Sequence, residues 1–391
     1  MNDVELFGNW SYPTSVRYGN GRIAELAEAC GALGIRRPLL VTDRGLAGLE
    51  ITAGALGRLA AGGLGDVLFA EVDPNPTGAN LDAGLEAYRA GGHDGVVAFG
   101  GGSALDLGKA VAFMARQSRP VWDFEDVGDW WTRADPDGID PIVAVPTTAG
   151  TGSEVGRASV LTNEATHEKK IVFHPRMLPG IVIADPELTV GLPPAITAGT
   201  GMDAFAHCLE AYCSPHFHPM SQGIALEGMR LVDAYLGRAY RDGADLEARA
   251  HLLAAAAMGA TAFQKGLGAI HALSHPIGAV HGTHHGTTNA TVMAPVLDFN
   301  RPAVEGRLAA AARYLGLADI GDGQARGFDA FRERVVALNE ALGIPRSLAE
   351  LGVTAPDLEA LTASALADPS VGGNPVPMTP ANVRALLEAC L

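Results

Sequence analysis

The sequence contains few cysteines, few positive charges and no long hydrophobic run. Its four cysteines form no CxxC pair, which favours a reducing compartment over a disulfide framework. The 28 Lys and Arg residues face 44 Asp and Glu residues, and the net charge of -16 disfavours nucleic acid and anionic lipid as partners. The longest apolar stretch, "LLAAAAMGATAF", is too short to span a bilayer, and the N-terminus lacks the apolar segment of a secretory signal. We therefore expect a soluble, cytoplasmic protein whose partner is a small molecule, with no membrane or nucleic acid involved.

The length of 391 residues exceeds that of an ordinary single core and predicts two domains. From about Arg37 to Pro186, short apolar runs such as "RPLLVTD", "DGVVAFGGG" and "DPIVAVPTT" alternate with helical patterns, which is typical of a parallel sheet with crossover helices. After about Leu192, long segments with apolar residues three and four apart indicate helices alone. We predict an α/β domain with a parallel sheet over residues 1–189 and an all-α domain over residues 190–391.

Two polar, glycine-bearing loops follow neighbouring strands of the predicted sheet. In "GVVAFGGGSALDLGKA" the glycines and Ser103 lie between a strand and a helix, where free N–H groups bind anions such as a pyrophosphate. The segment "VPTTAGTGSEVGR" supplies hydroxyl donors after the next strand. The first of these loops is neither a GxGxxG fingerprint nor a P-loop. Because open α/β sheets bind ligands at such strand ends, the two loops predict a dinucleotide-binding N-terminal domain.

Asp43 ends the strand-like run "LLVTD". A carboxylate at this place accepts hydrogen bonds from an adenosine ribose diol and repels a 2′-phosphate, which favours NAD over NADP. The alternative is that Asp43 only opens the turn before Gly45.

Histidines are concentrated in one segment, "IHALSHPIGAVHGTHHG", which holds five of the 12 in the chain. His271 and His275 are four residues apart in a helical pattern, and upstream Asp203 and His207 have the same spacing, which puts each pair on one helix face. Imidazoles with a single carboxylate suit Fe, Zn, Co or Ni better than Mg or Ca. The spacing alone does not decide which of the five histidines bind.

Six segments, in this order, resemble those of the iron-containing alcohol dehydrogenase family, and the resemblance covers nearly the whole chain. They are "DPNPT" (Asp73 to Thr77), "GGGSALDLGKA", "PTTAGTGSEV", "ADPELTVGLPP", "GMDAFAHCLEAY" and "HALSHPIGAVHGTHHG". The resemblance implies a dehydroquinate synthase-like architecture, with the active site in the cleft between the two domains and a metal-binding C-terminal domain. It implies four metal ligands, Asp203, His207, His271 and His285. His275 is then expected close to the metal without binding it.

The resemblance also implies the residues that hold the cofactor. The pyrophosphate is expected on Gly101, Gly102 and Ser103, the adenine and ribose on Asp43 and Thr147, and the nicotinamide on Thr148, Thr151 and Lys170. Asn75 and Asp106, which lie within matched segments, complete the predicted cofactor-binding set.

The implied activity is NAD(H)-dependent hydride transfer between a small primary alcohol and its aldehyde at a divalent metal. We favour Fe²⁺, because four protein ligands close a tetrahedral zinc site whereas iron accepts five or six; Zn²⁺ stays possible because it can expand to five. His275 is the candidate catalytic residue, since a neutral imidazole near pH 7 suits proton transfer to solvent. Related proteins are commonly dimers, so a homodimer or larger homo-oligomer is expected.

Two other functions stay open. With the same fold, zinc could act on a polyol or on an aldehyde bearing a carboxylate, phosphonate or sulfonate, and Lys265 in "FQKGLGAIH" would attract such an anion if it approached the pocket. Otherwise Lys265 is a solvent-facing lysine at a helix bend. The alternative of another class is a non-catalytic metal- or nucleotide-binding protein. His281 is expected to line the substrate pocket and His284 to be an incidental neighbour, and no contact is assigned to Arg157.

Overall fold

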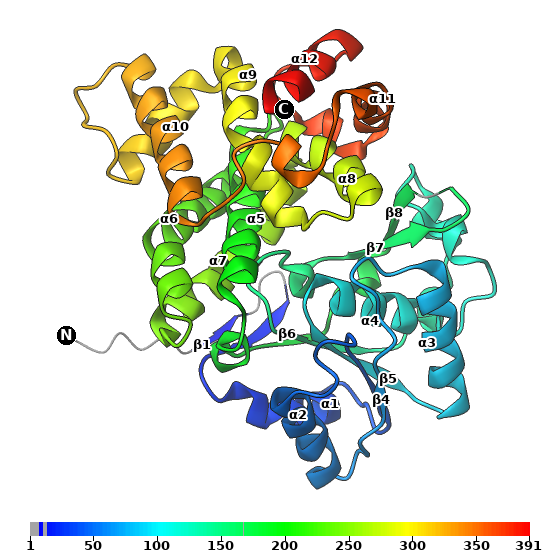
Figure 1. The fold of residues 1–391 in the computed structure, drawn as a ribbon. Coiled ribbons are helices and arrows are strands. Elements are labelled where there is room, and N and C mark those ends of the chain that lie inside the picture. The colour runs from blue at the N-terminus through cyan, green and yellow to red at the C-terminus, as the bar shows by residue number, and fades with distance from the viewer. Residues whose placement is uncertain (1–7, 11–13, 167) are drawn as a thin grey trace. The chain divides into compact units, whose positions relative to one another are not determined.

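A computed structural model describes residues 8–10, 14–166 and 168–391 (Figure 1). The chain divides into two compact units, one of Met1–Thr148 with Gly152–Val190 and one of Ala149–Thr151 with Gly191–Leu391. Residues 1–7 and 11–13, on which the expectation about a secretory signal partly depends, lie outside the described residues. Within the described part of the chain, no helix combines the length and apolar character that crossing a membrane requires.

The first unit is built on a mixed sheet of seven described strands with the order β1-β2-β9-β6-β5-β3-β4. All neighbouring pairs are parallel except β1 with β2. The strands are β1 (Gly8–Trp10), β2 (Ser15–Tyr18), β3 (Pro38–Val41), β4 (Leu68–Phe69), β5 (Gly95–Gly100), β6 (Ile142–Pro146) and β9 (Ile181–Ala184). The inner strands β3, β5, β6 and β9 are buried along their whole length, as expected of apolar runs covered on both faces. The predicted parallel sheet is therefore confirmed.

Helices cover both faces of this sheet (Figure 1). They are α1 (Leu26–Ala32), α2 (Glu50–Ala61), α3 (Gly78–Ala90) and α4 (Gly102–Met114). On one face, Leu26 of α1 and Leu59 of α2 join a core with Val97 and Val143. On the other face, α4 lies so close to β5 that a Cβ at Gly108 would be 2.6 Å from the Cβ of Ala98. The alternation of strand and helix in the sequence thus becomes a helix–sheet–helix arrangement.

The carboxyl ends of β5 and β6 lie side by side, because the Thr147 N–H donates to the Gly100 carbonyl at 3.0 Å. Gly100 has a φ of +145°, a conformation that favours glycine, and it leads directly into α4. After β6 the chain forms the short 3₁₀ helix η5 (Ser153–Val155) and an antiparallel hairpin of β7 (Ala158–Asn163) and β8 (Glu168–Phe173). This edge of the sheet therefore gathers the two polar loops singled out in the sequence.

The second unit is helical, and no strand occurs among its described residues. Its helices are α5 (Pro194–Cys213), α6 (Pro219–Arg241), α7 (Leu246–Ala262), α8 (Ala269–His281), α9 (His285–Tyr314), α10 (Gln324–Ala341), α11 (Leu358–Ala367) and α12 (Pro380–Cys390). Helix α5 packs against α6, α7 and α9 and is buried along most of its length (Figure 1). Small residues make this possible: a Cβ at Gly201 would be 2.3 Å from a Leu236 methyl group. The predicted all-helical part is confirmed.

Candidate metal centre and cofactor loops

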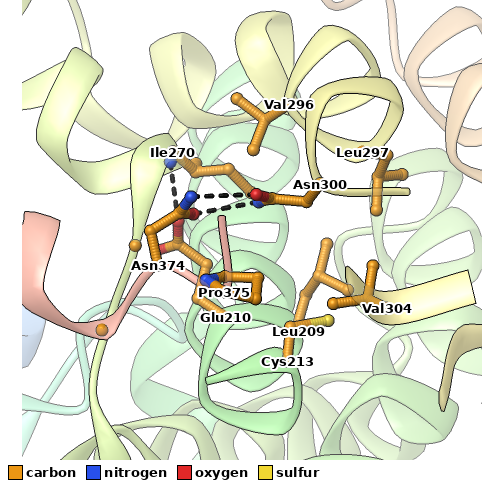
Figure 2. A pocket seen from close by; sticks show the side chains of 12 residues that line it. Leu209, Glu210, Cys213, Ile270, Val296, Leu297, Asn300, Val304, Asn374 and Pro375 are labelled. Carbon is orange, nitrogen blue, oxygen red and sulfur yellow. Dashed lines mark hydrogen bonds between the residues drawn. The ribbon is translucent and has the colours of Figure 1, made fainter. Parts of the chain in front are cut away.

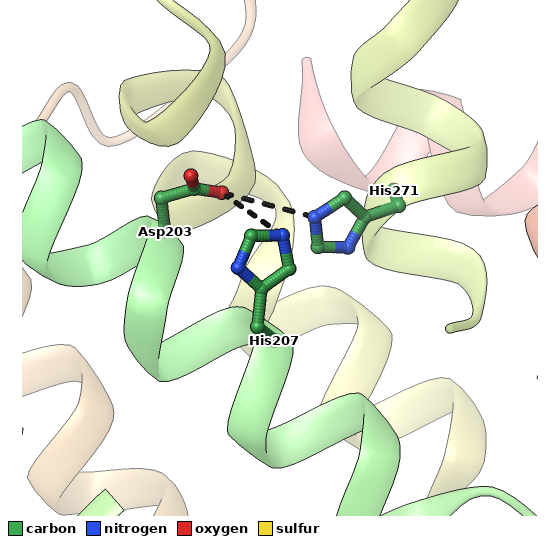
Figure 3. Close-up of side chains that lie close together, drawn as sticks. All are labelled: Asp203, His207 and His271. Carbon is green, nitrogen blue, oxygen red and sulfur yellow. Dashed lines mark ion pairs between the residues drawn. The ribbon is translucent and has the colours of Figure 1, made fainter. Parts of the chain in front are cut away.

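Helices α5 and α8 bring a carboxylate and two imidazoles together (Figure 3). Asp203 and His207 are one turn apart on α5, so they share a face, and they are 3% and 6% exposed. His271, in the first turn of α8, points at the same place and is 1% exposed. One ligand atom from each of the three residues lies within 4.8 Å of the others. These three residues form a candidate metal site.

His285 joins this group from the first residue of α9. The Nε2 atoms of His207, His271 and His285 lie 3.7, 3.7 and 3.5 Å from the same Asp203 oxygen, Oδ1. The neighbouring glycine permits this approach, because a Cβ at Gly286 would lie 2.0 Å from the Gly199 carbonyl oxygen of α5. The structure thus brings together all four residues that the resemblance implies as ligands.

The donor set fits a divalent transition metal. One carboxylate and three imidazoles suit Fe, Zn, Co or Ni. Among the described residues, the salt bridges of Asp203 involve histidines and no Lys or Arg, so no permanently charged side chain balances this buried carboxylate. A divalent cation would supply that charge.

Burial and mutual attraction set the protonation of the group. Burial alone would raise the pKa of the Asp203 carboxyl, but the three facing imidazoles outweigh burial and lower it below its ordinary value. Burial lowers the pKa of His207 to about 4, so this imidazole is neutral at pH 7 and its lone pair is available. For His271, burial is outweighed by the Glu210 and Asp203 carboxylates, which raise its pKa to about 9. The carboxylates of this cluster therefore favour a positive charge beside them.

Glu210 orients His271, and the sequence analysis missed it. One carboxylate oxygen lies 2.6 Å from His271 Nδ1, and the other accepts the Ile270 N–H at 2.6 Å. A carboxylate on Nδ1 fixes the ring so that Nε2 faces the metal position. The sequence signal existed, since Glu210 follows His207 by three residues and continues the same face of the helix.

Asn289, one turn after His285 on α9, was also missed. Its side-chain amide nitrogen donates to Asp203 Oδ1 at 2.8 Å and lies 3.2 Å from His285 Nε2. Both Asn289 and its carboxylate partner are buried. The amide therefore restrains the orientation of Asp203. Its signal in the sequence was the four-residue spacing from His285.

His275 lies beside the cluster and pairs with a distant carboxylate. Its ring stacks on His285 with a centroid distance of 5.2 Å, and its Nδ1 lies 2.7 Å from Asp368 Oδ2. Asp368 caps the 3₁₀ helix η11 (Pro369–Gly373), where it accepts the Ser370 N–H. A carboxylate at Nδ1 favours the tautomer whose Nε2 carries the free lone pair. No local sequence pattern links the two residues, which are 93 positions apart.

The glycine loop and the threonine loop present donors at the edge of the sheet. Gly101 precedes α4, and Gly102 and Ser103 are its first residues, so their N–H groups belong to the unpaired first turn. A Cβ at Gly101 would lie 3.3 Å from Thr148 Cγ2, which places the two loops in contact. Thr147 is 1% exposed, and its hydroxyl has no hydrogen-bond partner among the described residues. A buried hydroxyl without a protein partner fits a site that receives a polar ligand.

Other residues of the predicted cofactor set make contacts within the protein. Asp43 accepts the N–H groups of Gly45 and Leu46, which is the turn-opening role considered as its alternative. The carboxylate of Asp106 accepts from Ser153, Lys109 and the Val160 N–H. Ser103 donates to the Pro74 carbonyl, and Lys170 pairs with Glu168 at 2.8 Å and with Glu125 at 3.7 Å. Thr151 is partly buried in its loop, and Asn75 is exposed.

Lys265 differs from both expectations made for it. It ends the 3₁₀ helix η8 (Phe263–Lys265) and is 2% exposed, so the solvent-facing position is wrong. Its ammonium donates to the carbonyls of Ala211, at 2.9 Å, of Tyr212, at 3.2 Å, and of Ser214. Because these are the last carbonyls of α5, the cation caps the negative end of that helix instead of attracting a substrate anion.

Three further residues received contacts that the sequence could not assign. His284 caps α9, where its Nδ1 accepts the Thr287 N–H at 3.3 Å. His281 faces Asp357 at 3.6 Å from the last turn of α8. The Arg157 guanidinium lies 5.5 Å from the centre of the Phe173 ring.

Comparison with known proteins places this geometry in a family. A family model described as iron-containing alcohol dehydrogenase matches residues 13–186, and one described as the C-terminal part of the Fe-containing alcohol dehydrogenase family matches residues 197–391. A 4-hydroxybutyrate dehydrogenase from Cupriavidus necator is 39% identical over 387 residues, which cover 96% of this chain and 98% of that protein. The crystal structure of a 1,3-propanediol oxidoreductase gives a TM-score of 0.93 at 32% identity, covering 98% of this chain and 99% of that one.

A second solved structure is that of sulfoacetaldehyde reductase from Bifidobacterium kashiwanohense in complex with NAD⁺. It gives a TM-score of 0.85 at 30% identity and covers 98% of both chains. The family models together span most of the sequence, and the relatives are named as dehydrogenases or reductases. The chain therefore belongs to the iron-containing alcohol dehydrogenase family and is an oxidoreductase that acts on alcohols.

Proposed function

We propose that the protein interconverts a small primary alcohol and its aldehyde by hydride transfer with NAD(H) at a divalent metal. The observation that carries this proposal is the convergence of three imidazole Nε2 atoms on one buried oxygen of Asp203. The likeness to an NAD⁺ complex of a reductase supports the choice of cofactor.

The proposed metal ligands are Asp203, His207, His271 and His285. When bound, the metal would polarise the alcohol or aldehyde oxygen as a Lewis acid, and the nicotinamide would accept or donate the hydride. Glu210 and Asn289 hold His271 and Asp203 in place, so the ligands are preorganised before metal arrives. We favour Fe²⁺ over Zn²⁺ because four protein ligands leave a tetrahedral zinc no open position.

The cofactor is proposed to bind to the two loops of the first unit. The first-turn N–H groups of α4, at Gly102 and Ser103, suit the pyrophosphate. The buried Thr147 hydroxyl, with no partner among the described residues, is available to a polar group of the dinucleotide. We retain Asp43, Asn75, Asp106, Thr148, Thr151 and Lys170 as further proposed contacts, with Asp106 acting chiefly through its hold on the threonine loop.

His275 is proposed to take up the hydroxyl proton during alcohol oxidation. The Asp368 carboxylate, 2.7 Å from His275 Nδ1, favours the tautomer with its proton on Nδ1, which leaves the Nε2 lone pair free to accept another proton. The charged imidazole is then stabilised by the carboxylate and can release the proton to solvent. This role concerns the pair of residues and not the metal ligands.

A second candidate function differs in the chemical group that the substrate carries. The 39% identity to a 4-hydroxybutyrate dehydrogenase favours an alcohol that carries a carboxylate. Lys265 offers no support for it, because its ammonium is bound to the carbonyls of α5. Recognition of an anion would therefore need another side chain.

Activity assays with matched substrates test the proposal. The full-length protein with Fe²⁺ or Zn²⁺ and NAD⁺ is expected to oxidise 1,3-propanediol or 4-hydroxybutyrate, with NADH formation followed by absorbance. Asp203→Asn is expected to abolish this activity, whereas Glu227→Gln, a surface change on α6, leaves it intact. Absence of NADH formation with both substrates and both metals would contradict the proposal. The cytoplasmic location and the homodimer stay predictions.

A further inference from the structure

The helix that carries His271 and His275 has no capping side chain of its own. Gly268 precedes α8, and the first two N–H groups of the helix are bound by residues from distant segments. The Ala269 N–H donates to Asn374 Oδ1 at 3.0 Å. The Ile270 N–H donates to Glu210 at 2.6 Å (Figure 2). The orientation of α8 is therefore set by α5 and by the C-terminal segment, and not by local sequence.

Asn374 is itself held by a second asparagine. Its amide nitrogen donates to Asn300 Oδ1 at 2.9 Å, and Asn300 donates back to Asn374 Oδ1 at 2.9 Å (Figure 2). The remaining N–H of Asn374 donates to the Val376 carbonyl at 2.7 Å. Both asparagines are 7% exposed. Rotation of either amide would leave a buried polar group unpaired, which is unfavourable.

Two glycines allow the C-terminal segment to come this close. A Cβ at Gly268 would lie 2.8 Å from Asn374 Oδ1 and 3.1 Å from Glu210 Oε1. A Cβ at Gly373 would lie 2.0 Å from the Leu267 carbonyl oxygen. The approach therefore depends on side-chain-free positions on both segments.

The cavity beside the paired amides is too small for a ligand. Its volume is about 20 Å³, and apolar side chains such as Leu209, Val296 and Val304 form much of its wall (Figure 2). Such a space holds one water molecule at most. The asparagines are thus bonded to protein and do not form a binding site of their own.

We infer that Asn374 and Asn300 are positioning residues for the metal centre. They fix the first turn of α8, in which His271 is the third residue, against Glu210, which orients the His271 ring. The inference rests on the proposed function, since it takes His271 as a metal ligand. Loss of the pair would let the first turn of α8 shift and would misplace the imidazole.

The test compares metal affinity with stability in the metal-stripped full chain. Binding of Zn²⁺ alone is measured by competition with a colorimetric chelator, and unfolding is followed in urea. Asn374→Ala and Asn300→Ala are expected to weaken Zn²⁺ binding about 10- to 100-fold, as is typical when residues behind a metal ligand are removed. Asn374→Asp, which keeps an acceptor for the Ala269 N–H, is expected to weaken it less.

Asn80→Ala is the matched control. Asn80 is equally buried, at 7% exposed, and its side chain bonds to the Thr77 N–H and the Glu71 carbonyl at the start of α3, in the other unit. This change is expected to lower the stability while leaving the Zn²⁺ affinity unchanged.

Equal Zn²⁺ affinity of Asn374→Ala and the unchanged protein would overturn the inference and leave the proposed function intact. Should Asn374→Ala not fold, Asn300→Ala decides by the same criterion. Failure of the unchanged protein to bind Zn²⁺ or Fe²⁺ would overturn both the inference and the proposed function.

Discussion

Replacing Glu210 by glutamine tests how strongly the metal ligands are preorganised. The carboxylate accepts two buried donors, the Ile270 N–H at 2.6 Å and His271 Nδ1 at 2.6 Å. A glutamine has one acceptor and one donor end, so in either orientation its NH₂ group faces the Ile270 N–H or the Nδ1 of His271. If it faces Nδ1, that nitrogen must accept a hydrogen bond, and the ring then keeps its proton on Nε2, the atom directed at Asp203.

The magnitude follows from the number of mismatched groups. One buried donor left without an acceptor costs about 1–3 kcal/mol. At about 1.4 kcal/mol for each tenfold change, the metal dissociation constant is expected to rise roughly 5- to 150-fold. The dissociation constant rises because free energy is spent on orienting the His271 ring. The contributions of the other ligands to the binding free energy stay the same.

The assay is chelator competition with Zn²⁺ on the metal-stripped Glu210→Gln variant. Glu227→Gln on α6 serves as control, because its partly exposed carboxylate pairs with Arg230 and Tyr314 rather than with a proposed metal ligand. A dissociation constant within twofold of the unchanged protein would refute the reasoning that Glu210 orients the ligand.

Three further predictions concern other buried groups. Lys265→Met is expected to destabilise the fold by about 1.5–3 kcal/mol in urea unfolding, because the Ala211 carbonyl loses its charged donor. The preference for 4-hydroxybutyrate over 1,3-propanediol should stay the same. A changed preference would mean that Lys265 does contact the substrate. Burial raises the pKa of Glu154 from 4.5 to about 7, so the folded state binds the proton more tightly than the unfolded state does. The unfolding free energy should therefore fall by about 3 kcal/mol at most as pH rises from 4.5 to 7. Urea titrations of Glu154→Gln should lack this pH dependence, and an unchanged pH dependence would contradict the assignment. Asp368→Asn should lower kcat about tenfold or more, as measured by NADH formation, because His275 Nδ1 loses its carboxylate partner. The Zn²⁺ affinity should stay unchanged. An equal loss of metal affinity would mean that Asp368 supports the metal ligands instead.

Much of the fold could be predicted because its signals are local. Apolar runs such as Ile142–Pro146, ended by proline or glycine, became buried parallel strands. Segments with apolar residues three and four apart, such as Pro219–Arg241, became helices. The short strand β1 at the sheet edge was not predicted, since a strand of three residues gives too little periodicity to recognise.

The sequence predicts which candidate-site residues lie together only where their spacing is regular. Asp203 and His207 are four apart on one helix, which puts them on one face whatever surrounds them. Their meeting with His271 and His285 came from the family resemblance, because spacing alone left five histidines to choose from. Ligand roles for these residues stay predictions until metal binding is measured.

The contacts that bridge separate helices could not be predicted. Asn374 bonds to Ala269 across 105 positions, and His275 to Asp368 across 93. Lys265 shows the same limit: the sequence predicts a charge near a helix bend, but not that the ammonium turns onto the last carbonyls of α5. Such pairs depend on how the helices pack, and no regular spacing in the sequence indicates which distant residues will meet.

Removal and return of the metal tests the central claim most directly. The protein is stripped with chelator under anaerobic conditions, Fe²⁺ or Zn²⁺ is added separately, and the NADH absorbance is followed with neutral and anionic aldehydes. The account predicts no turnover in the stripped protein and turnover restored by Fe²⁺. Tight NAD⁺ binding with no turnover under either metal would mean that Asp203 and its histidines do not hold a catalytic metal.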